Sequence, residues 1–313
     1  ILVHRYLQTD HQVKHHNIQF DWGGAFIQVF ILLFFMAILD PPKISISGST
    51  PYEVSRLIIA LLIIILAILF FKIEAQVKAP LFDTSLLKIR TFVLSNIASF
   101  FTFISYSFVS VLMPFYLEQV HHFAPDKAGL FMTAIPLTIF IVAPISGRLS
   151  DRFGGQELSF IGAMVGAIGL FAMAGALGLG IFEQSSPAAI VLALSSIGLA
   201  TGLFQSPNNN AILSAVPNHK LGVASALLAM IRNLGFGTGT TLATGFFAWR
   251  QNVTGNFVQS LHFAFWVAGF FAVGAMFASL GRKRGVERGH VVSDGTEQSI
   301  HMDHVITPKK EGL

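Results

Sequence analysis

Long apolar runs alternate with short polar or glycine-rich segments along the chain. Eight such runs cover about residues 22–39, 57–71, 91–117, 128–146, 158–182, 187–216, 221–249 and 257–281. Most reach the roughly 20 residues that a helix needs to cross a bilayer core of about 30 Å. The shorter second run is flanked by Arg56 and Lys72, which can snorkel to both surfaces. Because a backbone in lipid must satisfy its own hydrogen bonds, the pattern predicts an all-α polytopic membrane protein with about eight transmembrane helices.

Composition agrees with this class of protein and narrows its chemistry. Hydrophobic residues make up 53% of the chain and charged residues 12%, whereas soluble domains carry about 25% charged residues. Cysteine is absent, which excludes disulfides and thiolate metal sites. His11 and His15 could share a helix face, but no carboxylate or cysteine joins them at ligand spacing. We therefore expect no metal site and no bound cofactor.

The distribution of basic residues predicts the orientation of the chain in the membrane. The two end segments and alternate loops carry fifteen of the twenty Lys and Arg residues, and the other set of loops carries four. Cytoplasmic loops hold the excess of positive charge, so both ends of the chain are expected in the cytoplasm. The net charge of +4 then reflects membrane topology, and no nucleic-acid partner is expected.

The segment "GRLSDRFGG" between the fourth and fifth runs resembles the loop motif of the major facilitator superfamily. Gly147, Asp151, Arg152 and Gly154 match the Gly, three residues, Asp-Arg, one residue, Gly pattern. The family pattern usually continues with further basic residues, whereas Gly155 and Gln156 follow here, which is typical of its second and more degenerate copy.

Three further segments resemble the 14-helix drug–proton antiporter branch of that superfamily. They are "FDWGGA" (20–25), "MPFYLEQVHHFAPDKAGL" (113–130) and "SPNNNAILSAVPNHKLGVASALLAMIRNLGFGTG" (206–239). The branch has six helices, two extra central helices and six more. The resemblance implies a cytoplasmic linker at 1–20, the two extra helices at 21–75, a cytoplasmic loop at 76–91, the C-terminal six-helix bundle at 92–284 and a polar cytoplasmic tail at 285–313.

The resemblance also implies a function. It indicates efflux of drugs or other small amphipathic compounds by alternating access across a bacterial cytoplasmic membrane, driven by the proton gradient. The partners would be the lipid bilayer, a small-molecule substrate and an N-terminal six-helix bundle that this chain lacks. No Asp or Glu lies inside any of the eight runs, and Asp40, Glu118 and Glu183 lie near their outer ends. The chain therefore has no visible proton relay of its own.

The resemblance gives the "GRLSDRFGG" segment a gating role. Gly147 would allow neighbouring helices to approach closely. Asp151, expected at or just before the start of the next helix, would cap free amides or pair with Arg148 or Arg152 as a latch at the water interface. The alternative is that these charges, together with the turn at Gly154, only fix topology and solvate a tight connection.

Arg232 is the ionisable residue that lies deepest in an apolar run, about a dozen residues into the seventh. Insertion scales give a cost of roughly 2.5–3.5 kcal/mol for such a charge at a helix centre. We consider two interpretations: Arg232 with Asn233 lines the transport pathway or takes part in coupling, or Arg232 packs structurally against another helix.

Other small and polar residues point to helix contacts. Pro207 is expected to end or kink the sixth span, where Asn208 and Asn209 would line the cytoplasmic mouth or cap the carbonyls that the proline frees. Two glycine pairs at a spacing of four predict close helix packing; these are Gly198 with Gly202, and Gly235 with Gly239.

Two other classes of function are alternatives to transport by a two-bundle protein. The chain could be a stand-alone half-bundle that acts as a membrane scaffold or as one subunit of a two-chain transporter. A membrane-embedded enzyme is disfavoured, because no set of His, Glu or Asp recurs at catalytic or metal-ligand spacing inside the runs.

Overall fold

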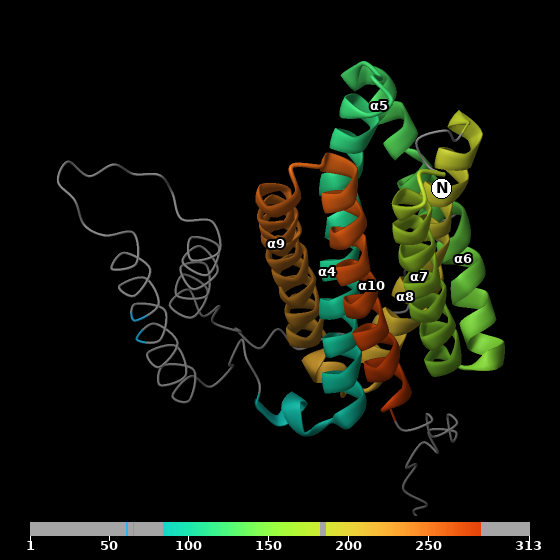
Figure 1. Ribbon diagram of the computed structural model, residues 1–313. Helices are drawn as coiled ribbons and strands as arrows, with labels where there is room; N and C mark the ends of the chain where they lie inside the picture. Colours follow the sequence, from blue (N-terminus) through green and yellow to red (C-terminus); the bar gives the residue numbers. More distant parts are fainter. Residues whose placement is uncertain (1–60, 62–64, 66–83, 182–185, 283–313) are drawn as a thin grey trace, which may run out of the picture. The chain divides into compact units, whose positions relative to one another are not determined.

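The computed structural model describes residues 61, 65, 84–181 and 186–282, and of Thr84 and Asp151 the backbone only. In these residues all regular secondary structure is helical, which confirms the all-α prediction. The 1–20 linker, the two extra helices at 21–75 (apart from residues 61 and 65) and the 285–313 tail lie outside the described residues. Figure 1 shows the helices of the described part standing side by side as a bundle.

Six helices of the described part are long and apolar enough to cross a membrane, with α5 and α6 forming one span over Pro125–Ser150. They match the six spans predicted between residues 91 and 281. The elements are η1 (Thr84–Lys88), α4 (Arg90–Gln119), α5 (Pro125–Met132), α6 (Ala134–Phe153), α7 (Gly155–Gly178), α8 (Pro187–Ser214), η2 (Asn218–Lys220), α9 (Leu221–Thr254) and α10 (Phe257–Leu280).

Local sequence sets several of these helix ends. α9 ends at Gly255, whose φ of 65° is left-handed and therefore suits glycine. The next residue, Asn256, is the N-cap of α10, and its Oδ1 accepts a hydrogen bond from the Gln259 backbone N–H at 3.0 Å. Pro125 and Pro187 occupy the first turns of α5 and α8, where the missing N–H has no cost.

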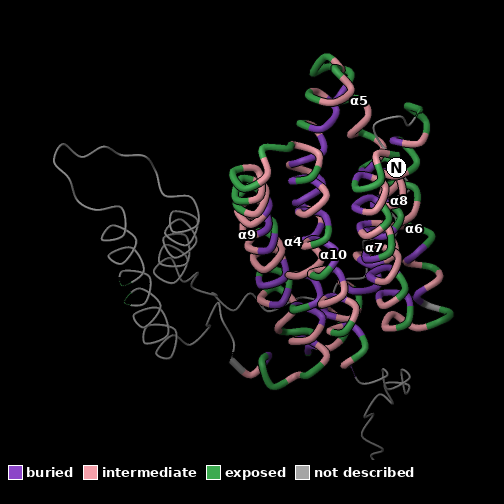
Figure 2. Tube along the Cα trace, in the orientation of Figure 1, coloured by how far each residue is buried: buried purple, intermediate pink, exposed green. Residues whose placement is uncertain are grey.

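The six spans pack in two equivalent sets. α4 packs on α9 and α10, whereas α8 packs on α6 and α7; α7 also packs on α10, and α4 touches α8. In chain order the spans form two triples, α4, α6, α7 and α8, α9, α10. The first helix of each triple thus packs on the second and third helices of the other triple. In Figure 2, α4 is largely buried while α6 and α9 carry more exposed residues, which agrees with their positions at the flanks.

The bundle has two ends, which differ in the elements that meet there. We call the end that contains the α6–α7 junction the motif end. The Lys220 Nζ donates to the Ser85 Oγ there at 2.7 Å, and the Gln156 Nε2 donates to the Arg282 carbonyl at 3.1 Å, so η1, η2, the start of α7 and the end of α10 meet at this end. The opposite end, with α5 and the α9–α10 turn, is called the far end (Figure 1).

Both predicted glycine pairs lie where two helices come closest. A Cβ built on Gly235 would lie 2.8 Å from the Phe100 carbonyl oxygen of α4, and one on Gly239 would lie 2.6 Å from that of Ile104. A Cβ on Gly198 of α8 would likewise lie 2.6 Å from the Ile135 carbonyl of α6. Such distances are too short for any side chain, so these contacts require bare backbone.

Gly239→Ala is expected to destabilise the protein by about 1–3 kcal/mol, because the added methyl group forces α9 away from α4. Gly245→Ala is the matched control on the same helix, since a Cβ there meets no atom within 4 Å. Thermal unfolding of the purified protein in detergent measures both. Equal unfolding temperatures for the two variants would contradict the packing.

Candidate functional site

The segment 147–155 forms the junction between α6 and α7. α6 extends through Asp151 to Phe153, Gly154 follows with a φ of +94°, and α7 begins at Gly155. That φ is one that L residues rarely adopt, so glycine allows the reversal. We expected Asp151 at or just before the start of the next helix, and this was wrong: it lies in the last turn of α6, because no Gly or Pro occurs in residues 148–153 to end that helix earlier. The structure describes no atoms of its side chain.

The other charged residues at this junction face outward. Arg148 and Arg152 are exposed, and the acidic residue in the first turn of α7 is Glu157. An acidic residue in that position complements the positive end of the helix dipole. The gating role of the motif residues stays a prediction.

A hydrogen bond links α6 to α8 beside Pro207. The sequence predicted an end or a kink of the helix there, but α8 continues through Pro207 to Ser214. The proline has no N–H to donate to the Leu203 carbonyl, and the Ser146 Oγ of α6 donates to that carbonyl instead, at 3.1 Å. At the next residue of α6, a Cβ on Gly147 would lie 3.2 Å from the Ser206 Oγ of α8. Small side chains thus bring the two helices together where the proline leaves an acceptor free.

The side chain of Asn208 is the centre of a buried hydrogen-bond network at the motif end. Its Nδ2 donates to the Ser99 Oγ at 2.7 Å and to the Ser95 carbonyl at 3.2 Å, both on α4. Its Oδ1 accepts from the Arg282 Nη2, which also donates to the Ser279 Oγ of α10 at 3.3 Å. One amide therefore connects α8 to both α4 and the end of α10.

Arg282 brings a positive charge into this network. It lies two residues beyond α10 and is only 5% exposed. Burial lowers the pKa of Arg282 to about 10, so the guanidinium remains charged at neutral pH. Its Nε and Nη1 are buried without a partner. The charge lies next to the C-terminal end of a helix, where the helix dipole favours a cation.

Sequence reasoning counted Arg282 among the basic residues of the C-terminal end segment. It placed Asn208 at the cytoplasmic mouth or as a cap of freed carbonyls, and missed that the two side chains meet. A usable signal was present: Asn208 is an amide in an otherwise apolar run, and a buried amide needs partners. Ser95 and Ser99 lie one turn apart on α4 and could supply them. The sequence contained no signal that the Arg282 side chain folds back into the bundle.

Arg232 lies apart from this network, at the interface of α9 with α4. Its guanidinium carbon is 5.8 Å from the centre of the Phe103 ring, a cation–π geometry. The Tyr106 ring is 6.4 Å from Phe103 and 6.3 Å from Phe236. We call these four residues the Arg232 group. Arg232 is half-buried and makes no ion pair with a described carboxylate.

The four polar residues predicted for the pathway therefore do not form one cluster. Asn208 is buried in the network at the motif end, and Asn209 is half-buried beside it. Asn233 is exposed, whereas Arg232 packs against α4. Of these four residues only Arg232 is a cation, and it lies against an aromatic ring.

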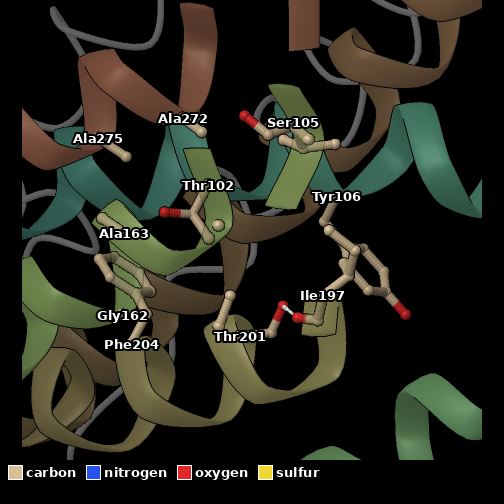
Figure 3. A pocket seen from close by; sticks show the side chains of 13 residues that line it. Thr102, Ser105, Tyr106, Gly162, Ala163, Ile197, Thr201, Phe204, Ala272 and Ala275 are labelled. Carbon is tan, nitrogen blue, oxygen red and sulfur yellow. Dashed lines mark hydrogen bonds between the residues drawn. The ribbon is translucent and has the colours of Figure 1, made fainter. Parts of the chain in front are cut away.

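A small cavity lies inside the bundle, between α4, α7, α8 and α10 (Figure 3). Its volume is about 30 Å³, enough for one or two water molecules. The Thr201 Oγ1 in its wall donates to the Ile197 carbonyl at 2.8 Å, whereas the Thr102 Oγ1 is buried without a partner. A water molecule in the cavity would satisfy Thr102, but the space is far below the roughly 300 Å³ of the smaller ligand sites.

Asn208→Ala is expected to lower the free energy of unfolding by about 2–3 kcal/mol, because hydrogen bonds to a buried charge are lost. Asn209→Ala is the matched control, with a change within about 0.5 kcal/mol. Denaturant unfolding in detergent measures both. A double variant, Asn208→Ala with Arg282→Met, should recover part of the loss because the charge is removed too; strictly additive effects would contradict the coupling.

The sequence is similar to a known protein family and to several known transporters. A family model described as the Major Facilitator Superfamily matches residues 17–240 and 95–296. The riboflavin transporter RibZ of Clostridioides difficile is 36% identical over 203 residues, which cover 64% of this chain and 43% of that protein. The multidrug export protein EmrB of Haemophilus influenzae is 31% identical over 172 residues, which cover 54% of this chain and 32% of that protein.

A third relative, the uncharacterized transporter YebQ of Escherichia coli, is 33% identical over 202 residues, covering 63% of this chain and 43% of that protein. The chain thus spans less than half the length of these relatives. The family and the relatives are transporters, and the described part supplies six membrane-spanning helices. The chain is therefore a multi-pass membrane protein that belongs to the major facilitator superfamily.

Proposed function

We propose that this chain is the C-terminal portion of a secondary transporter that exports drugs or other small amphipathic compounds in exchange for protons. Family membership supports transport, and the similarity to a multidrug export protein supports this class of substrate. The membrane is the cytoplasmic membrane of a bacterium, with the motif end in the cytoplasm. Of the nine described Lys and Arg residues, six lie at the motif end and two at the far end, as the positive-inside rule requires.

The observation that supports this proposal most directly is that the interior of the bundle is closed, whereas the Arg232 group is accessible. The cavity between α4, α7, α8 and α10 has a volume of only about 30 Å³, so a substrate does not fit inside the six-helix bundle. The Arg232 group is accessible, since Phe236 is 38% exposed and Arg232 and Tyr106 are half-buried. The substrate binds against this surface, and a second bundle, encoded upstream of this chain, forms the facing wall.

The chemistry of the Arg232 group favours flat aromatic compounds. Phe103, Tyr106 and Phe236 offer rings for stacking, and the Arg232 guanidinium offers hydrogen bonds and a positive charge. The riboflavin transporter among the relatives supports this class as well, because riboflavin carries a planar ring system. Riboflavin is therefore a useful probe beside amphipathic dyes.

The proton-carrying carboxylate belongs to the upstream bundle. Within the six described spans, Asp and Glu occur only in terminal turns, as with Glu118 of α4 and Glu157 of α7. A titratable carboxylate inside the membrane is what proton coupling needs. The proton gradient is then the driving force, and the chain uses no bound cofactor.

Cells that lack their own efflux pumps and express the complete coding sequence are expected to accumulate less ethidium than control cells, and an uncoupler should abolish the difference. The 313-residue chain alone, at equal expression, should not lower accumulation, because it provides one wall of the site.

Two outcomes would contradict the proposal. Export by the chain alone would show that no upstream bundle is needed. A complete protein that inserts normally but moves neither dyes nor riboflavin would favour the alternative that the chain is a scaffold or one subunit of a two-chain transporter.

Arg232→Gln in the complete protein is expected to lower the initial export rate about tenfold at unchanged expression, because the substrate loses a cationic partner. Arg232→Lys keeps the charge and should retain much of the rate. Lys127→Gln removes an exposed charge from the far end and is the matched control. Unchanged export by Arg232→Gln would place Arg232 outside the pathway.

A further inference from the structure

An open cleft lies at the far end of the bundle, between α7, α9 and the start of α10. Its volume is about 740 Å³, and its walls include Arg250, His262, Phe263 and Trp266. None of the described residues that line it is Asp or Glu. The cleft is separate from the Arg232 group and plays no part in the proposed transport.

Glycines at the end of α7 create this space. A Cβ on Gly175 or on Gly180 would meet no atom within 4 Å, so both positions border open volume. Gly178 has another role, because a Cβ there would lie 2.6 Å from the imidazole of His262. The His262 Nδ1 donates to the Ala174 carbonyl at 2.7 Å, which fixes the ring against the end of α7.

Arg250 supplies the charge of the cleft. Its guanidinium carbon is 5.8 Å from the centre of the Phe263 ring, and its Nε is buried without a partner. No hydrogen bond or ion pair joins the guanidinium to a described residue. A guanidinium with an unpaired donor and no acidic neighbour among the described residues of the cleft is suited to an anionic oxygen ligand such as a phosphate.

Exposed aromatic rings continue from the cleft toward the middle of the membrane. The Trp266 ring is 4.9 Å from Phe171 and 6.4 Å from Phe270. Trp266 is 38% exposed and Phe270 is 66% exposed. In a membrane-spanning helix such an exposed apolar surface contacts lipid chains.

We propose that this cleft binds an anionic phospholipid, with its phosphate held by Arg250 and an acyl chain lying along Trp266 and Phe270. The charge accounts for the headgroup, and the exposed aromatic surface accounts for the chain. A soluble phosphate compound would use only the first of these two features. The lipid belongs to the leaflet at the far end, opposite the motif end.

Native mass spectrometry of the purified complete protein tests the proposal. With added phosphatidylglycerol, Arg250→Gln is expected to lower the retained lipid about tenfold, the range for a charge-assisted hydrogen bond. Lys127→Gln, which removes an exposed charge at the same end of the bundle, should retain as much lipid as the unmodified protein. Equal retention by Arg250→Gln and Lys127→Gln would overturn the proposal.

A second pair of variants leaves the charge in place. Gly175→Leu adds a side chain to the cleft wall at a position where a Cβ meets no atom within 4 Å, and it should also lower retention. Gly245→Leu adds the same side chain outside the cleft, where a Cβ likewise meets no atom within 4 Å, and it should not. Full retention by Gly175→Leu would overturn the proposal even if Arg250→Gln fails to fold. Displacement of the lipid by soluble glycerol phosphate at equal concentration would show a phosphate site without a lipid chain, which also overturns it.

Discussion

The described bundle depends on the close approach of helix backbones at glycines. In lipid, apolar side chains gain nothing by leaving one apolar surrounding for another, so helices associate through dispersion contacts and short approach distances. Four helix pairs have a glycine at the contact: Gly239 for α9 and α4, Gly198 for α8 and α6, Gly162 for α7 and α8, and Gly269, which receives the Phe171 ring, for α10 and α7. At Gly162 a Cβ would lie 2.5 Å from the Phe204 backbone nitrogen.

Such contacts hold pairs of helices but do not select one arrangement of six, and buried polar groups add that selection. Asn208 has hydrogen-bond partners on α4 and beyond α10, so α8 cannot rotate or slide without leaving an amide and a guanidinium unpaired. The cost of an unpaired buried polar group is about 1–3 kcal/mol and more for a charge. The network therefore fixes the register of the three helices at the motif end, while the glycines fix their distance.

The sequence pattern predicted the spans and the helix faces that carry glycines, but it did not predict the polar contacts. The spans could be predicted because their length follows from bilayer thickness, and Gly235 and Gly239 lie on one face because of helix periodicity. Asp151 was misplaced because a helix end depends on which residue first adopts a non-helical φ, and a motif does not state that. The pairing of Asn208 with Arg282 joins positions 74 residues apart, and the apolar pattern carries no information about such contacts.

The position of Pro207 has a consequence for motion. Its missing N–H is compensated by a hydroxyl of another helix, since the Ser146 Oγ bonds the Leu203 carbonyl. If α6 separated from α8 at this height, that carbonyl would face lipid or another helix with no donor. Separating the two helices therefore requires another donor for that carbonyl, such as a water molecule entering between them.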